Sequence, residues 1–181
     1  MNFKGFKSGT DIRGYGAEQF SDEPLYLSDE FVMAVAESFA NWLGARTGKY
    51  TNEITVSIGR DSRVSGPRIM AAAITALTAK GVKVYSCGLA STPAMFMSTL
   101  DLKCDGAIQI TASHHPWERN GLKFFTPDGG LEGENIAELF LADDDTIIIG
   151  GDLMDGLDQD LNAFLNKILD EGEDEMKNVK V

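Results

Sequence analysis

The sequence contains little cysteine and little histidine. Among its 181 residues there are two cysteines, Cys87 and Cys104, and two histidines. Neither cysteine has the CxxC spacing of a metal site, and both fall in apolar, strand-like surroundings. Such surroundings favour two buried reduced thiols over a disulfide. The chain therefore shows no sign of a disulfide framework.

Long hydrophobic runs are also absent. No stretch approaches the ~18 apolar residues that a bilayer-spanning helix needs, and the N-terminal "MNFKGFKSGT" lacks the apolar core of a signal peptide. Apolar residues make up 43% of the chain and charged residues 24%, a globular composition. We therefore expect a soluble, cytoplasmic protein with a core of its own and no membrane partner.

Positive charge is scarce in one part of the chain only. The net charge is −12, yet residues 1–131 hold 13 acidic and 13 basic residues, whereas residues 132–181 hold 15 acidic and 3 basic ones. A nucleic-acid-binding surface would require a basic stripe with interleaved aromatic residues, and none is present. Nucleic acid is therefore not an expected partner.

Cap residues, apolar periodicity and β-branched runs predict alternating helices and strands. The predicted caps are Ser28, Ser65 and either Ser91 or Thr92. The predicted helices cover 28–44, 65–81, 91–100, 131–141 and 157–170, and the predicted strands cover 53–59, 82–88, 105–111, 121–126 and 146–150. This alternation predicts an α/β fold, a three-layer α/β/α arrangement with a mixed, mainly parallel sheet.

The last connection sets the direction of one strand and the extent of the domain. The ten residues 111–120 are too few for a parallel crossover, so strand 121–126 is predicted to run antiparallel. We expect residues 1–150 to form the domain and residues 151–181 to form an acidic C-terminal helix or linker.

The stretch "QITASHHPWERNGLKFF" holds both histidines, beside Ser113. It begins where the predicted strand 105–111 ends. Ligands of open α/β sheets bind beyond the carboxyl ends of the strands, and loops on a rigid sheet often carry function. Ser113 is therefore a candidate site residue.

Several chemistries of a serine or a glycine-rich loop are poorly supported. Ser113 lies in T-A-S-H-H, which lacks the G-x-S-x-G nucleophile elbow. A triad with His114 as base remains a formal possibility, although adjacent serine and histidine rarely align for it. The two neighbouring histidines also make a poor start for a zinc site. Gly9 and Gly14 have the Walker A interval, but Tyr15 stands where lysine is required.

Phosphate chemistry fits the stretch better. A phosphoryl group on Ser113 would add a charge of about −1.5 to −2 and three acceptor oxygens, and so would need cationic neighbours. The chain offers such residues in three segments, although Arg63 and Arg68 fit a surface cluster paired with acids equally well. The candidates are His114, His115, Arg119, Lys123, Arg13, Arg60, Arg63 and Arg68.

Three motifs, in the order "SGTDIRG", "IGRDSRVSGPRI" and "TASHHPWERNGLKFF", resemble the first domain of the α-D-phosphohexomutases, a superfamily that includes phosphoglucomutases and phosphomannomutases. The resemblance spans about residues 8–140. It implies an intramolecular phosphotransferase that interconverts hexose 1-phosphates and 6-phosphates through a bisphosphorylated sugar.

The resemblance also implies roles for five residues. Ser113 carries the phosphoryl group, and His114 hydrogen-bonds near the group in transfer. Lys123 of the N-G-x-K element is the candidate general acid/base, and Arg13, Asn120 and Lys123 bind substrate or phosphate. Mg²⁺ binds an oxygen of the Ser113 phosphate, and a hexose 1,6-bisphosphate acts as activator.

The chain departs from the family pattern in two ways. His115 stands where asparagine is most frequent, and the D-G-D-x-D-R, G-E-x-S-G-H and C-terminal phosphate-binding elements are absent. The acidic run 143–145 does not replace the metal-binding element. We expect a first domain that contacts domains 2–4 of a longer mutase and is inactive alone. The alternative is a non-catalytic domain that binds a phosphorylated ligand or a protein partner.

Overall fold

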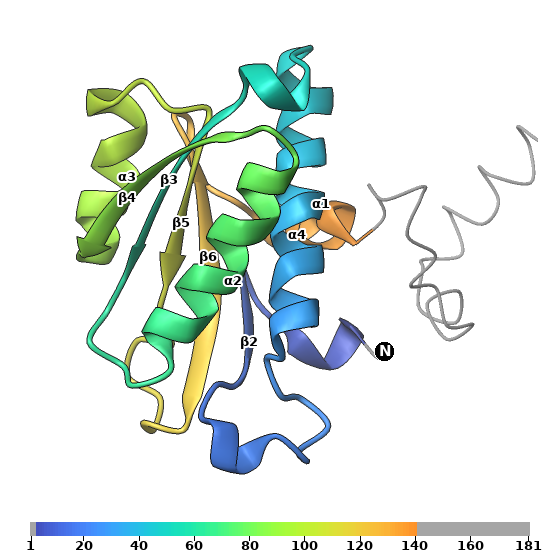
Figure 1. Ribbon diagram of the computed structural model, residues 1–181, viewed down its shortest axis with the longest axis vertical. Coiled ribbons are helices and arrows are strands. Elements are labelled where there is room, and N and C mark those ends of the chain that lie inside the picture. The colour runs from blue at the N-terminus through green and yellow to red at the C-terminus, as the bar shows by residue number, and fades with distance from the viewer. Residues whose placement is uncertain (1–2, 141–181) are drawn as a thin grey trace, which may run out of the picture. The chain divides into compact units, whose positions relative to one another are not determined.

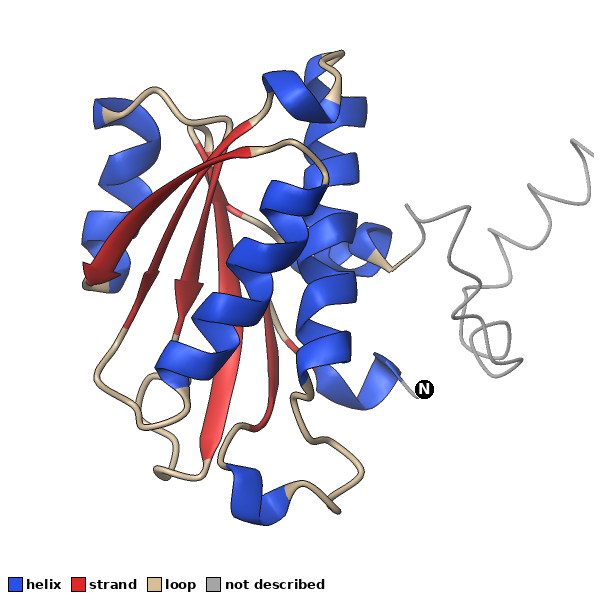
Figure 2. Ribbon diagram, viewed as in Figure 1, coloured by secondary structure: helices blue, strands red, loops and turns tan. Residues whose placement is uncertain are grey.

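A computed structural model of the chain describes residues 3–140 and shows a mixed sheet with helices on both faces (Figures 1 and 2). The described part contains seven strands in the order β1-β2-β6-β5-β3-β4, with β7 paired to β6. The strands are β1 (Lys7–Ser8), β2 (Asp11–Tyr15), β3 (Thr55–Arg60), β4 (Lys83–Leu89), β5 (Gly106–Ile110), β6 (Arg119–Thr126) and β7 (Gly129–Gly130).

Within residues 3–140, four α-helices complete the three layers: α1 (Asp29–Thr47), α2 (Gly66–Ala79), α3 (Thr92–Asp101) and α4 (Gly133–Leu139). Successive side chains of a strand point to opposite faces, and two phenylalanines of β6 show which helices cover each face. The ring of Phe124 lies 4.8 Å from Phe39 of α1, whereas that of Phe125 lies 6.2 Å from Phe96 of α3. Helix α2 packs against α1. The predicted α/β/α class is confirmed.

The sheet is mixed, as predicted, and strand β6 runs antiparallel to β5. The parallel pairs are β3–β4 and β3–β5, while β2–β6, β1–β2 and β6–β7 are antiparallel. The antiparallel share is thus larger than the sequence indicated. The reason is β2, a five-residue strand whose polar residues gave no strand signal and which pairs with β6 along Asp11–Tyr15.

Helix ends differ from the predictions in two places. Ser28 caps α1 as predicted, its hydroxyl accepting the Phe31 N–H at 3.2 Å. The helix does not end at Gly44 but continues to Thr47, because Gly48 adopts the left-handed conformation (φ 71°) that closes a helix. Ser65 precedes α2 without a side-chain cap, since its hydroxyl accepts a hydrogen bond from Asn120 instead.

Two further predictions concern the cysteines and the C-terminal segment. Both cysteines are free, and Cys104 is buried as predicted while Cys87 is partly exposed. Burial raises the pKa of both thiols. No helix within residues 3–140 is long and apolar enough to cross a membrane. The predicted strand 146–150, the helix 157–170 and the segment 151–181 lie outside the described residues.

Candidate active site

The serine loop, residues 111–118, joins β5 to β6 and starts at the carboxyl end of β5. Ser113 is exposed in this loop and has a left-handed backbone conformation, with φ at 56°. A non-glycine residue in this region costs on the order of 1 kcal/mol and persists only where its surroundings hold it. Part of that restraint is the Thr111 hydroxyl, which accepts the Ser113 N–H at 2.9 Å.

The two histidines lie beside the serine without forming a tight pair with it. The Oγ of Ser113 is 3.4 Å from Nδ1 of His114, beyond the usual reach of about 2.6–3.2 Å for a base that removes a proton. The His114 and His115 rings are tilted against each other with centroids 5.1 Å apart. This geometry gives no support to an activated serine–histidine pair.

The surroundings of His115 are electropositive. Burial is the main cause that lowers the pKa of His115 from its ordinary value, and the positive charges of Arg13, His114, Arg119 and Arg63 lower it further. Cations that disfavour a protonated imidazole would favour a phosphate group at the same place. Positive groups therefore lie close to the serine loop, where Arg13 and Arg63 are also paired with Asp11 and Asp61.

The lowered pKa of His115 makes a testable prediction. Its imidazole should titrate below the ordinary ~6.5, so the folded state binds this proton less readily than the unfolded state. The contribution to stability is thus complete above pH ~6.5 and is lost as the pH falls through the folded-state pKa. An NMR titration of the ring signals measures the pKa directly.

The control is His115→Asn, which cannot titrate. Its thermal stability should fall less than that of the wild type between about pH 7 and pH 5. A wild-type ring that titrates above the ordinary histidine value would contradict the electropositive description of the loop.

A carboxylate, Asp11, joins two of the predicted site residues. Asp11 and Arg13 occupy the same face of β2, and the register of β2 with β6 places Lys123 opposite Asp11. The Asp11 carboxylate accepts hydrogen bonds from Arg13 Nη2 at 2.6 Å and pairs with Lys123 Nζ at 2.7 Å. Arg13 Nη1 lies 3.5 Å from the Ala112 carbonyl oxygen of the serine loop. Arg13, Lys123 and the serine loop are therefore connected.

Sequence reasoning missed Asp11, which is only 4% exposed. The available signal was the spacing D-x-R, because residues two apart on a strand share a face. That signal could be read only after 11–15 had been recognised as a strand.

Asn120 does not join this group. Its side chain is fully buried, with Nδ2 donating to Ser65 Oγ at 2.9 Å and Oδ1 accepting the Gly121 N–H at 2.9 Å. It thereby ties β6 to the start of α2. The structure thus brings together Ser113, His114, Arg13 and Lys123 of the predicted site residues, and places Asn120 in a structural role behind them.

Gly121 is required for the close approach of β2 to β6. A methyl group at this position would lie 2.4 Å from the Ile12 carbonyl oxygen and 3.0 Å from that of Thr111. Both are backbone oxygens, which cannot rotate away as the end of a flexible side chain can. Gly121→Ala should therefore destabilise the domain by about 2 kcal/mol or more, measured by urea unfolding.

The matched control for that change is Gly129→Ala, since nothing lies within 4 Å of a methyl group there, although its φ of 136° adds strain. The free energy of unfolding should fall less in Gly129→Ala than in Gly121→Ala. Equal decreases would show that contact with the neighbouring backbone is not what excludes a side chain at residue 121.

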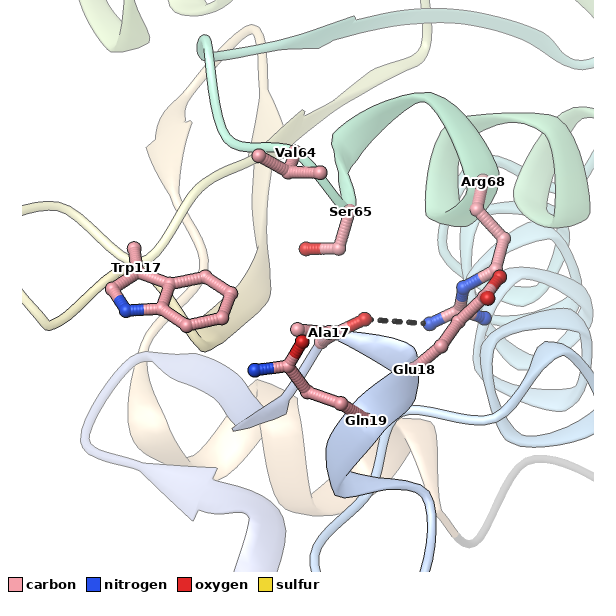
Figure 3. A pocket seen from close by; sticks show the side chains of 8 residues that line it. Ala17, Glu18, Gln19, Val64, Ser65, Arg68 and Trp117 are labelled. Carbon is pink, nitrogen blue, oxygen red and sulfur yellow. Dashed lines mark hydrogen bonds between the residues drawn. The ribbon is translucent and has the colours of Figure 1, made fainter.

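A hollow of about 470 Å³ lies between Trp117 of the serine loop and the residues at the start of α2 (Figure 3). Trp117 lies on one side of it, and Arg68 donates a hydrogen bond across the other side to the Gly16 carbonyl oxygen at 3.1 Å. Trp117 belongs to the serine loop, but neither Ser113 nor Lys123 lines this hollow. Its lining residues are Gly16, Ala17, Glu18, Gln19, Val64, Ser65, Arg68 and Trp117.

The sequence matches the family described as "Phosphoglucomutase/phosphomannomutase, alpha/beta/alpha domain I" over residues 7–144. This match covers more than half of the chain and includes the serine loop, β2 and β6. The chain belongs to the phosphoglucomutase/phosphomannomutase family. The resemblance seen in the three sequence motifs is thereby confirmed.

Individual relatives carry mutase names. A phosphoglucosamine mutase of Nautilia profundicola is 37% identical over 131 residues, which are 72% of this chain and 27% of the relative. A phosphoglucomutase/phosphomannomutase of Thermococcus kodakarensis is 36% identical over 137 residues, 74% of this chain and 28% of the relative. The chain therefore spans little more than a quarter of the length of these relatives.

A solved structure of a phosphoglucomutase/phosphomannomutase family protein from Burkholderia thailandensis is also similar. It superposes with a TM-score of 0.64 at 26% identity, covering 78% of this chain and 30% of that one. The structural likeness therefore concerns the same domain as the sequence match.

The described residues do not form the metal site that a phosphohexomutase would require. Within residues 3–140 no group of three or more His, Cys, Asp or Glu side chains could hold an ion. Asp11, the carboxylate nearest the predicted site residues, is already paired with Arg13 and Lys123.

Proposed function

We propose that this chain is the phosphoserine-bearing domain of a phosphohexomutase that interconverts hexose 1-phosphates and hexose 6-phosphates. The observation that carries the proposal is the contact between two segments distant in sequence, the first motif on β2 and the third motif, which runs from the serine loop into β6. Arg13 on β2 and Lys123 on β6 both bind Asp11, and Arg13 also reaches the loop that holds Ser113. Membership of the mutase family supports this reading.

In the proposed first half-reaction, a hexose 1-phosphate attacks the phosphoserine with its 6-hydroxyl oxygen. The bond between phosphorus and Ser113 Oγ breaks as the bond to the sugar oxygen forms. Nζ of Lys123 takes the hydroxyl proton as it gives one of its own to the Asp11 carboxylate 2.7 Å away. Ser113 Oγ leaves with the bonding electron pair and takes up a proton from solvent. The product is a hexose 1,6-bisphosphate and an unmodified serine.

The second half-reaction reverses these steps with the other phosphate. The bisphosphate turns over in the site, and Ser113 Oγ attacks the phosphorus at position 1. That phosphoryl group returns to the serine and leaves the hexose 6-phosphate. A free hexose 1,6-bisphosphate would therefore act as activator, because it can prime an unmodified Ser113.

Charge is the second support for this proposal. Phosphoryl transfer depends mainly on positioning and on neutralising the oxygens of the group in transfer. The groups whose positive charges lower the pKa of His115 lie in the serine loop or next to it. His114 and Arg119 are close in sequence, and Arg13 and Arg63 contact carbonyl oxygens of the loop. Arg13 would bind phosphate oxygens from its place beside Ala112, and His114 would donate to them from 3.4 Å beside Ser113 Oγ.

Mg²⁺ is the proposed metal, with an oxygen of the Ser113 phosphate as its one ligand from the described residues. Its other ligands, and the groups that select the sugar, would come from further domains like those of the longer relatives. We accordingly propose that contacts with such domains complete the site, and that residues 3–140 alone do not turn over substrate.

The test uses the protein expressed from its whole reading frame. It is supplied with glucose, mannose or glucosamine 1-phosphate, a trace of the matching 1,6-bisphosphate and Mg²⁺, and the 6-phosphate is measured by an enzyme-coupled assay. We expect conversion of at least one of these sugars. Binding of all three without conversion would contradict the proposal and favour a non-catalytic domain for phosphorylated ligands.

A further inference from the structure

One arginine, Arg63, contacts the backbone of the serine loop at several points. It lies in the connection between β3 and α2, outside the loop itself. Its Nη1 donates to the carbonyl oxygens of Pro116 at 2.7 Å and Arg119 at 2.9 Å, and its Nη2 donates to those of Ser113 at 2.8 Å and His115 at 2.7 Å. A single side chain thus binds four carbonyl groups within seven residues.

All five N–H groups of this guanidinium are in use. The fifth, on Nε, donates to Asp61 Oδ2 at 3.2 Å, and the side chain of Arg63 is 11% exposed. A guanidinium has five donors in a fixed planar fork and no acceptor. Arg63 therefore has no donor left for a phosphate oxygen, although its charge still acts on the loop.

Asp61 links the same arginine to the other side of Ser113. Asp61 Oδ2 accepts the Thr111 hydroxyl at 2.7 Å, and the oxygen of that hydroxyl accepts the Ser113 N–H at 2.9 Å. The peptide groups on both sides of Ser113 are thus held, the N–H through Thr111 and the C=O by Arg63. This double attachment explains how the left-handed conformation of Ser113 persists.

We propose that Arg63 is a positioning residue for the phosphoserine: it fixes the backbone conformation that presents Ser113 Oγ for transfer, and it does not contact the phosphoryl group. The inference rests on the proposed function as far as the reaction is concerned, and on the hydrogen bonds alone as far as the loop is concerned. A displacement of about 1 Å in a reacting group is enough to cost about 100-fold in rate.

Arg63→Lys is the informative variant. Lysine keeps the positive charge but offers three donors from a single point, so it cannot reproduce the planar fork that binds four carbonyl groups. In the protein expressed from its whole reading frame, we expect kcat to fall on the order of 100-fold while KM for the sugar phosphate changes little. A change in sugar binding alone would instead appear in KM.

A second readout is independent of the reaction. Hydrogen exchange of the amides of Ser113, His115 and Arg119, followed by NMR on the 181-residue chain, reports the order of the serine loop. In Arg63→Lys these amides should exchange at least about 10-fold faster, while those of β3 and β5 stay within about threefold of the wild type. Thr111→Val removes the hydroxyl that links Asp61 to the Ser113 N–H, so it should also speed hydrogen exchange of the Ser113 amide.

The matched control is Arg68→Lys. Arg68 is a similarly buried arginine in the first turn of α2, and it binds the carbonyl oxygens of Gly16 and Leu27 rather than the serine loop. Arg68→Lys should lower the melting temperature and leave kcat and the loop amides unchanged. An equal fall of kcat in both variants would make the effect one of general stability and would overturn the proposal.

The two claims fail in different ways. If the wild type converts sugar phosphate and Arg63→Lys does so within threefold of its kcat, the positioning role is wrong and the proposed function stands. If the wild type shows no conversion but Arg63→Lys selectively loosens the loop amides, the proposed function fails and the backbone role of Arg63 stands. Faster exchange spread evenly over the whole sheet would overturn the positioning role.

Discussion

Ser113→Ala should abolish sugar phosphate turnover by the protein expressed from its whole reading frame. Without the hydroxyl no phosphoserine can form, and loss of a covalent catalytic group typically costs on the order of 10⁴-fold or more in kcat. The Ser113 side chain is exposed, so the melting temperature should change by only a few degrees. Steady-state kinetics with a coupled assay, together with a thermal melt, measure both quantities.

Ser91→Ala provides the control for a lost serine hydroxyl. Ser91 caps α3 by accepting the Ala94 N–H at 3.3 Å, so its removal should cost about 1 kcal/mol of stability without affecting turnover. If Ser113→Ala kept more than about a hundredth of the wild-type kcat, phosphoryl transfer through Ser113 would be untenable.

Lys123→Ala should lower kcat by about 10²- to 10⁴-fold, the usual contribution of a positioned general acid or base. Nζ of Lys123 is held by the carboxylate of Asp11, which also holds Arg13. Removing Lys123 leaves that carboxylate with its arginine partner, so the fold should survive the change. The measurement is kcat over a range of pH, because the loss of a proton-transfer group should also alter the pH profile.

Lys80→Ala serves as the matched control, since Lys80 follows α2 and its nearest acidic partner is Glu37 at 3.8 Å. It should retain wild-type kinetics. Full activity of Lys123→Ala, with an unchanged pH profile, would show that the sugar hydroxyl loses its proton to some other group. The proposed role of Lys123 would then be wrong, although that of Ser113 would stand.

The sequence was most informative where local chemistry determines structure. Ser28 was predicted as a helix cap, and Ser91 was one of two candidate caps for its helix; both accept the backbone N–H three residues later. The antiparallel direction of β6 followed from the shortness of the loop before it. Strand β2 was missed because its pairing with β6 is a long-range interaction, and the polar pattern of D-I-R-G-Y carries little local strand signal.

The candidate site also combines residues that a local motif identifies with residues that only long-range contacts reveal. Ser113, Arg13 and Lys123 were identified through motif resemblance, and the structure links Lys123 to Arg13 through Asp11, and Arg13 to the serine loop through the Ala112 carbonyl oxygen. Asp11 and Arg63 gained their importance only through partners distant in sequence, such as Lys123 for Asp11 and the carbonyl groups of the serine loop for Arg63. Such contacts depend on the register of β2 against β6 and on the path of the loop, which no local pattern determines.

Asn120 is a motif residue whose contacts in the structure differ from those that the motif predicted. The motif N-G-x-K placed it among the binding residues, but the alternation of β6 turns its side chain to the opposite face from Lys123, where it bonds to Ser65. Gly121 of the same motif is explained by the close approach of Ile12. Two residues of this motif therefore serve the architecture that positions its lysine.

The most direct measurement of the central claim is the phosphorylation state of Ser113 after incubation with a hexose 1,6-bisphosphate and Mg²⁺. The protein expressed from its whole reading frame is analysed by intact mass and by peptide mapping across residues 105–123, with Ser113→Ala treated in parallel. Our account predicts the added mass of one phosphate, located on Ser113 and absent from the variant. A wild-type Ser113 that stays unmodified while the protein converts sugar phosphate would contradict it.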